Sequence, residues 1–103
     1  MRGDVYRLRA SRDARGHEQR GARYAVVVQS DDLPLSTLLV APTSTSARAA
    51  SFRPEIDVDG RATRVLAEHT AAVDPNRLGD LVGHLRSDQL RQVEAALRLV
   101  LDL

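Results

Sequence analysis

The densest group of polar side chains in the sequence lies at residues 16–23, which read Gly-His-Glu-Gln-Arg-Gly-Ala-Arg. This stretch brings an imidazole (His17), a carboxylate (Glu18) and two guanidinium groups (Arg20 and Arg23) within seven residues. An imidazole can transfer protons near neutral pH, and a guanidinium can hold two phosphate oxygens at once. The stretch leads directly into an apolar segment that would anchor it. It therefore indicates either chemistry on an anionic substrate or a solvated cluster of ion pairs.

A second candidate group is the run of hydroxyl side chains at residues 43–46, Thr-Ser-Thr-Ser, which follows Pro42. Hydroxyls at the end of a strand commonly bond to the local backbone and form turns. The same hydroxyls can donate to a phosphate oxygen. On the sequence alone, both interpretations stay open for Thr43 and Ser44.

Several other chemistries lack the residues that they need. The sequence has no cysteine, which excludes a disulfide scaffold, a thiolate zinc site and a cysteine nucleophile. His17, His69 and His84 are spread out, and the adjacent Glu68 and His69 would point to opposite faces of a strand. There is no Gly-x-Ser-x-Gly elbow and no Walker or dinucleotide glycine pattern. We expect no metal and no cofactor.

Length and charge set the broad class. A chain of 103 residues supports one domain, and its hydrophobic content of 43% suits a globular core. No apolar run approaches the roughly 20 residues that cross a bilayer, and the first residues show no apolar signal region, so we expect a cytoplasmic protein. All fifteen cations are arginine and the net charge is only +1. Residues 1–23, however, hold seven arginines against three acids, a local excess of +4 that favours an anion-binding face.

The elements that must position these groups are short strands followed by one helix. Residues 24–29 form a continuous, largely β-branched run that fits a buried strand, and residues 11–21 read as a long loop. We expect further strands at residues 5–8, 37–41, 52–58, 63–67 and 81–85. Pro42 is expected to end the strand before it. A tight turn is expected at Asp59-Gly60 and a helical turn over residues 74–79.

Helical periodicity is clear only at the C-terminal end, over residues 88–101. Ser87 is suited to cap this helix. An apolar face is expected to pack on the sheet, made of Leu90, Val93, Leu97, Val100 and Leu101. The predicted class is therefore α+β, a small β-barrel of five to seven strands covered by a C-terminal helix.

These segments together resemble the MazF/PemK/Kid family of bacterial toxin endoribonucleases over essentially the whole chain. Residues 2–6 are similar to the family's first strand, R-G-[DE]-[IV]-[YW], and residues 16–23 resemble its G-[SH]-E-Q-x-G-x-R segment. Residues 39–44 resemble a strand that ends in a Pro-x-Thr-Ser turn, and residues 67–74 resemble L-E-Q-x-R-T-[IL]-D. The chain departs from these motifs at Tyr24, usually a proline, and at Leu66 and Ala71, where arginines are usual.

The resemblance implies a single toxin domain over residues 1–103 with an SH3-like barrel. It implies a type II toxin that cleaves single-stranded RNA at specific sequences, without a metal, through attack by the ribose 2′-OH. It also implies a homodimer with RNA in a groove between the subunits, and a cognate antitoxin whose acidic, flexible segment fills that groove. The competing interpretation is a toxin of the CcdB type, or a binding module on the same barrel, that does not cleave RNA.

The resemblance also assigns roles to individual residues. Arg23 would hold the phosphate, and one hydroxyl, from Thr43 or Ser44, would add a second donor. Ser44 is favoured slightly, because aligning Pro42 with the proline of the family's turn places Ser44 at the position of the family's hydroxyl. The general base would be Glu18 or His17. RNA contacts are expected from Gln19, Arg20, Arg15, Arg53, Phe52 and Glu68.

Overall fold

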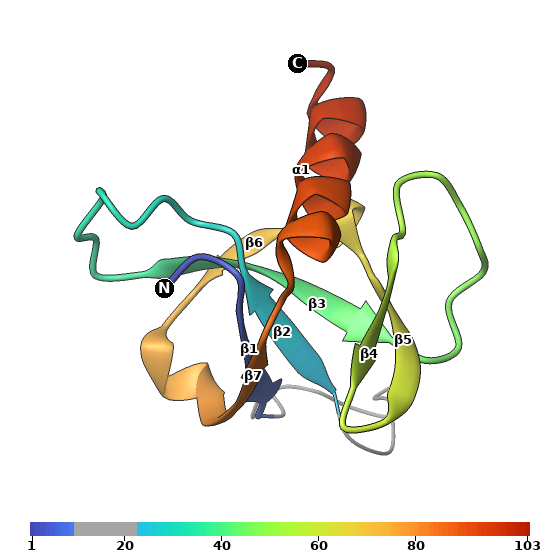
Figure 1. Ribbon diagram of the computed structural model, residues 1–103. Helices are drawn as coiled ribbons and strands as arrows, with labels where there is room; N and C mark the ends of the chain where they lie inside the picture. The colour runs from blue at the N-terminus through green and yellow to red at the C-terminus, as the bar shows by residue number, and fades with distance from the viewer. Residues whose placement is uncertain (10–22) are drawn as a thin grey trace, which may run out of the picture.

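The computed structural model describes residues 1–9 and 23–103, which form a curled antiparallel sheet followed by one helix (Figure 1). Its strands are β1 (Asp4–Leu8), β2 (Tyr24–Val27), β3 (Leu38–Ser44), β4 (Glu55–Val58), β5 (Arg61–Val65), β6 (Ala71–Val73) and β7 (Leu78–His84). Two short 3₁₀ helices, η1 (Ala67–His69) and η2 (Pro75–Arg77), lie between the later strands, and the helix α1 spans Ser87–Leu101. This arrangement agrees with the predicted α+β class and its C-terminal helix.

The strand order is β4-β5-β3-β2-β1-β7, with β6 paired to β3 outside this path. Strand β3 is the strand around which the sheet curls, because it pairs with β2 along one edge and with two different strands along the other. Its first half pairs with β6, at residues 38–40, and its last two residues pair with β5. The predicted strand over residues 24–29 is found as β2 at the centre of this sheet.

Strand β2 is buried on both faces, which explains its continuous apolar sequence. On the inner face, Tyr24 and Val26 belong to the main core with Val5, Val28, Ala41, Ile56, Val58, Val65, Leu85 and Val93. On the outer face, Ala25 and Val27 pack with Val40 in a second cluster, which Tyr6, Leu8, Leu38, Val73 and Leu78 flank. Alternate residues of β2 and β3 therefore pack into two different apolar clusters, one on each face of the sheet.

The prediction that Pro42 ends its strand is wrong, because β3 continues to Ser44. Proline lacks an N–H, so it is tolerated in a sheet only where no ladder bond is needed. Pro42 lies between the two partners of the outer edge: β6 pairs up to Val40 and β5 begins at Thr43. The Pro42 carbonyl still accepts a hydrogen bond from the Leu66 N–H at 2.8 Å. The strand thus passes through proline without losing a ladder bond.

Both predicted turns are present. Asp59 and Gly60 have positive φ angles of 53° and 77° and join β4 to β5 as a two-residue hairpin. At the second turn, the Asp74 carboxylate accepts a hydrogen bond from the Asn76 N–H at 2.8 Å and caps η2. This helical turn ends at Arg77, so Gly79 lies inside β7 instead of ending the turn.

The helix α1 packs through a partly different set of residues from the one predicted. Its buried residues are Gln89, Val93 and Ala96, and Leu90 and Leu97 are partly buried. The N-cap is Arg86, one residue before the predicted Ser87, and its N–H donates to the Gln89 side chain at 3.0 Å.

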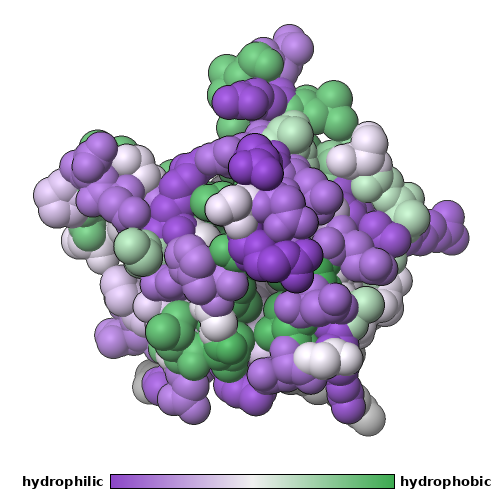
Figure 2. All heavy atoms as spheres, viewed as in Figure 1, coloured by the Kyte–Doolittle hydropathy of each residue, from purple (hydrophilic) through white to green (hydrophobic). Residues whose placement is uncertain are grey.

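The prediction that Val100 and Leu101 face the sheet is wrong, since they are 36% and 60% exposed. Figure 1 shows the reason: the last turns of α1 project beyond the sheet. Figure 2 shows hydrophobic and hydrophilic side chains side by side at this free end, at the top of the view. Within residues 1–9 and 23–103, no helix is long and apolar enough to span a membrane.

Candidate anion-binding site

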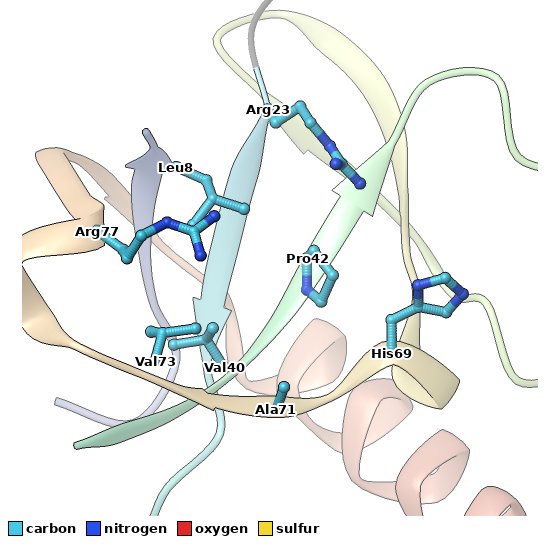
Figure 3. Close-up of a pocket in the computed structure, with 8 residues that line it drawn as sticks. All are labelled: Leu8, Arg23, Val40, Pro42, His69, Ala71, Val73 and Arg77. Atoms are coloured by element: carbon cyan, nitrogen blue, oxygen red, sulfur yellow. The ribbon is translucent and has the colours of Figure 1, made fainter. Parts of the chain in front are cut away.

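A pocket of about 210 Å³ opens on the outer face of the sheet, between the start of β2 and the segment from η1 to η2 (Figure 3). Its apolar surface comes from Leu8, Val40, Pro42, Ala71 and Val73. Its polar lining side chains are Arg23, His69 and Arg77. The described residues that line the pocket thus include two guanidinium groups and no carboxylate. This composition suits a ligand that carries negative charge and an apolar or aromatic part.

Arg23 is held in position by the strand that it precedes. Its backbone carbonyl accepts a hydrogen bond from the Leu8 N–H at 2.9 Å, which ties this end of β2 to β1. The side chain lines the pocket, and its Nε atom is buried without a hydrogen-bond partner in the part of the chain that the structure describes. A buried cationic donor without a partner is costly unless a ligand completes it. Arg23 is therefore the strongest anion-binding candidate in the pocket.

The pairing of β2 with β3 separates the two candidate hydroxyls. The last pair of β2 and β3 is Ala25 with Pro42, and side chains alternate along each strand, so Arg23 falls on the outer face with Ala25 and Ser44 falls on it with Pro42. Thr43 faces the core and is only 1% exposed. Its hydroxyl accepts a hydrogen bond from the Tyr24 N–H at 3.3 Å.

Ser44 is also buried, at 5% exposure. Its Oγ lies 3.2 Å from the Oγ of Ser46 and accepts a hydrogen bond from the Ser46 N–H at 3.3 Å. Neither Thr43 nor Ser44 is among the residues that line the pocket. Ser44 shares a face with Arg23 at the end of β3, whereas Thr43 does not.

Three of the predicted RNA contacts form one cluster of their own. The Arg53 Nε donates to Glu68 Oε2 at 2.7 Å, and the Arg53 guanidinium lies 5.3 Å from the centre of the Phe52 ring. The other carboxylate oxygen of Glu68, Oε1, is buried with no hydrogen-bond partner within the described residues. Burial raises the pKa of Glu68, but hydrogen bonds and the nearby charges of Arg53 and His69 outweigh it, so the net pKa is lowered. None of these three side chains lines the pocket.

Two polar residues of the pocket, His69 and Arg77, were not predicted from the sequence. The sequence offers His69 only as a possible metal ligand, and its pattern places Glu68 and His69 on a strand. They lie instead on η1, where Glu68 bonds Arg53 and His69 lines the pocket. Arg77 comes from η2, and its guanidinium donates twice to the Arg9 carbonyl, at 3.2 Å each. Their positions in the sequence do not show that they lie near Arg23, because only the pairing of the strands brings these residues to one pocket.

The other predicted site residues, Arg15, His17, Glu18, Gln19 and Arg20, lie outside the described residues. Within residues 1–9 and 23–103, no three histidine, aspartate or glutamate side chains are grouped so as to hold a metal ion.

The chain is thus a small curled-sheet barrel with a C-terminal helix and a pocket on its outer face whose two arginines suit an anionic ligand. Residues 1–101 match the family described as PemK-like, MazF-like toxin of type II toxin-antitoxin system. A candidate toxin of Mycobacterium tuberculosis, Rv3098A/RVBD_3098A, is 45% identical over 104 residues, covering 100% of this chain and 98% of that protein. Endoribonuclease EndoA of Bacillus subtilis is 30% identical over 110 residues, covering 99% of this chain and 94% of that protein.

Solved structures share the fold. An endoribonuclease from a mycobacterial species, in complex with its cognate antitoxin, has a TM-score of 0.80 and 19% identity, over 100% of this chain and 95% of that chain. MazF from Deinococcus radiodurans has a TM-score of 0.77 and 24% identity, over 99% and 96% of the two chains. The chain belongs to the PemK-like, MazF-like family of type II toxins, as the motifs at residues 2–6 and 16–23 indicated.

Proposed function

We propose that this chain is the toxin of a type II toxin-antitoxin system and acts as an endoribonuclease on single-stranded RNA, through one toxin domain over residues 1–103. The proposal rests on its family and on its likeness to EndoA, whose name gives that activity. Cleavage proceeds by attack of the ribose 2′-OH on the adjacent phosphorus. This route uses protein groups for proton transfer and charge stabilisation, and it requires no metal.

The single observation that carries the mechanism is the buried Arg23 Nε, which lines the pocket without a hydrogen-bond partner among the described residues. A guanidinium presents forked donors and a fixed charge, which match two oxygens of a phosphate. The negative charge on these oxygens grows as the phosphorane forms. Arg23 thus stabilises the transition state more than the bound substrate, which is the condition for raising the rate.

In this proposal a hydroxyl at the end of β3 adds a second donor. Ser44 is preferred to Thr43, because it shares the face of Arg23 while the Thr43 hydroxyl is directed to the Tyr24 N–H. The base that removes the 2′-OH proton is Glu18 or His17. Arg15, Gln19 and Arg20 are proposed to contact RNA from the same stretch, and Arg53, Phe52 and Glu68 from the cluster beside η1.

The proposed assembly is a homodimer with RNA between its subunits. The proposed regulator is an antitoxin with an acidic, flexible segment that competes with RNA for the same cationic groups. Because RNA is the proposed substrate, the proposed place of action is the cytoplasm.

The test is incubation of the purified protein with single-stranded RNA in EDTA, with Arg23→Ala and the exposed Arg61→Ala side by side. The wild-type protein and Arg61→Ala should leave a 2′,3′-cyclic phosphate or 3′-phosphate opposite a 5′-hydroxyl. Arg23→Ala should lose roughly 10²-fold in rate or more, about the effect of removing one oxyanion donor. A requirement for Mg²⁺, or a 5′-phosphate product, would contradict the 2′-OH mechanism.

A further inference from the structure

We propose that His69 is the general acid of the RNA cleavage, donating a proton to the departing 5′-oxygen. The inference rests on the proposed function and goes beyond it, since it assigns the proton donor to a residue of η1. It begins from geometry: η1 sets the His69 ring at the pocket that Arg23 lines, although 46 positions separate the two residues in the sequence. Figure 3 shows Arg23 from the start of β2, His69 from η1 and Pro42 of β3 around the same pocket.

The chemistry needs a proton donor besides Arg23 and besides the base, which is Glu18 or His17 in the proposed function. When the 2′-oxygen bonds to phosphorus, the bond from phosphorus to the 5′-oxygen breaks, and this oxygen leaves with an electron pair. An alkoxide is a poor leaving group, so it must take up a proton as it departs. Arginine holds its proton too firmly, with a pKa above about 12, and an ionised carboxylate has no proton to give.

Imidazole meets this need because its unperturbed pKa, about 6.5, allows both protonation states near neutral pH. The described part of the chain contains two histidines, His69 and His84. His84 lies on β7, where its Nδ1 is 2.8 Å from Asp4 Oδ1, and it does not line the pocket. His69 is exposed at the pocket, where a bound phosphodiester can reach it.

The attacking and leaving oxygens lie on opposite sides of the phosphorus. The base and the acid must therefore be different groups on opposite sides of the phosphate. The proton of the 2′-OH passes to the base, and the proton of His69 passes to the 5′-oxygen. The products are a 2′,3′-cyclic phosphate and a 5′-hydroxyl, and His69 is left neutral until it takes a proton from solvent.

The test compares His69→Gln on ordinary RNA and on RNA whose scissile 5′-oxygen is replaced by sulfur. Glutamine keeps hydrogen-bonding capacity but does not titrate. A thiolate leaves without protonation, so a variant that lacks only the acid recovers its rate on the sulfur substrate. His69→Gln should be about 10²-fold slower than wild type on ordinary RNA and close to wild type on the sulfur substrate. Arg23→Ala should be slow on both substrates, because the phosphorane still needs its cation.

His84→Gln is the matched control, and it should match wild type on both substrates. Melting temperatures of the variants verify the fold, which an exposed side chain such as His69 should leave intact. Full activity of His69→Gln on ordinary RNA would overturn the assignment. Equal slowing on both substrates would also overturn it, because it would show a role in binding or positioning. A wild-type protein that cleaves no RNA would overturn the proposed function and this inference together.

Discussion

The Thr43 hydroxyl accepts a hydrogen bond from the Tyr24 N–H at 3.3 Å, one residue beyond the last backbone pairing of β2 with β3. That last pairing joins Ala25 to Pro42. A side chain therefore takes over the connection between the strands next to Arg23. This contact gives Thr43 a structural role that is separate from the chemistry proposed for Ser44.

Replacing Thr43 by valine should destabilise the protein while leaving the RNA cleavage rate nearly unchanged. Valine keeps the shape but leaves the buried Tyr24 N–H without an acceptor, which costs about 1–3 kcal/mol. Urea unfolding followed by circular dichroism measures this loss. An unchanged free energy of unfolding would show that the Tyr24 N–H finds another partner.

Ser44→Ala should lower the cleavage rate about tenfold or more with nearly unchanged RNA binding, if its bond forms mainly in the transition state. Ser46→Ala is the matched control, since Ser46 is exposed and its Oγ lies 3.2 Å from that of Ser44. Single-turnover cleavage and RNA titration separate rate from binding. A larger rate loss in Thr43→Ala than in Ser44→Ala would transfer the role to Thr43. Two small effects would indicate that both hydroxyls only stabilise the local backbone.

The free energy of unfolding should fall on acidification, in part through Glu68. Its pKa in the folded protein lies below the ordinary 4.5, so the folded state binds this proton less readily than the unfolded state. The stabilisation is complete above about pH 4.5 and is lost as the pH falls through the folded pKa. Glu68→Gln should therefore flatten the decline between neutral and acid pH, which urea unfolding at both pH values measures. An equally steep decline in the variant would place the acid-sensitive groups elsewhere, for example at Asp4, whose pKa is also lowered.

Val93→Ala should cost about 2 kcal/mol of stability, because two buried methyl groups are lost from the core. Leu101→Ala should cost little, since Leu101 is 60% exposed at the free end of α1. Thermal unfolding of the two variants provides the comparison. A larger effect at Leu101 would mean that another surface covers the end of α1.

The sequence pattern predicted those elements whose signal lies in residues that are neighbours along the chain. The β-branched run of β2, the Asp59-Gly60 turn and the helix from about residue 88 each carry their own signal. The sequence wrongly predicted that the strand ends at Pro42. The missing N–H of Pro42 costs no ladder bond, because two different strands, β6 and β5, pair with that edge of β3 on either side of it. The pattern also failed at the end of α1, where apolar periodicity continues beyond the sheet.

The candidate site was only partly predictable, for a related reason. Arg23 was singled out because it belongs to a dense local motif. His69 and Arg77 line the same pocket as Arg23 because β6, which lies between η1 and η2 in the chain, pairs with β3. Glu68 and His69 lie on a 3₁₀ helix instead of the expected strand, where Glu68 bonds Arg53 and only His69 lines the pocket. Side-chain roles that depend on such pairing cannot be derived from spacing along one chain.

Strand order also has a consequence for biosynthesis. The first strand to leave the ribosome, β1, ends up between β2 and β7, the last strand to be made. A nascent chain can pair β1 with β2 early, but β1 keeps one open edge until residues 78–84 have been translated. The sheet and the core under α1 therefore close only near the end of translation, when these distant segments meet. A chain that ends before β7 therefore lacks the strand that completes this sheet.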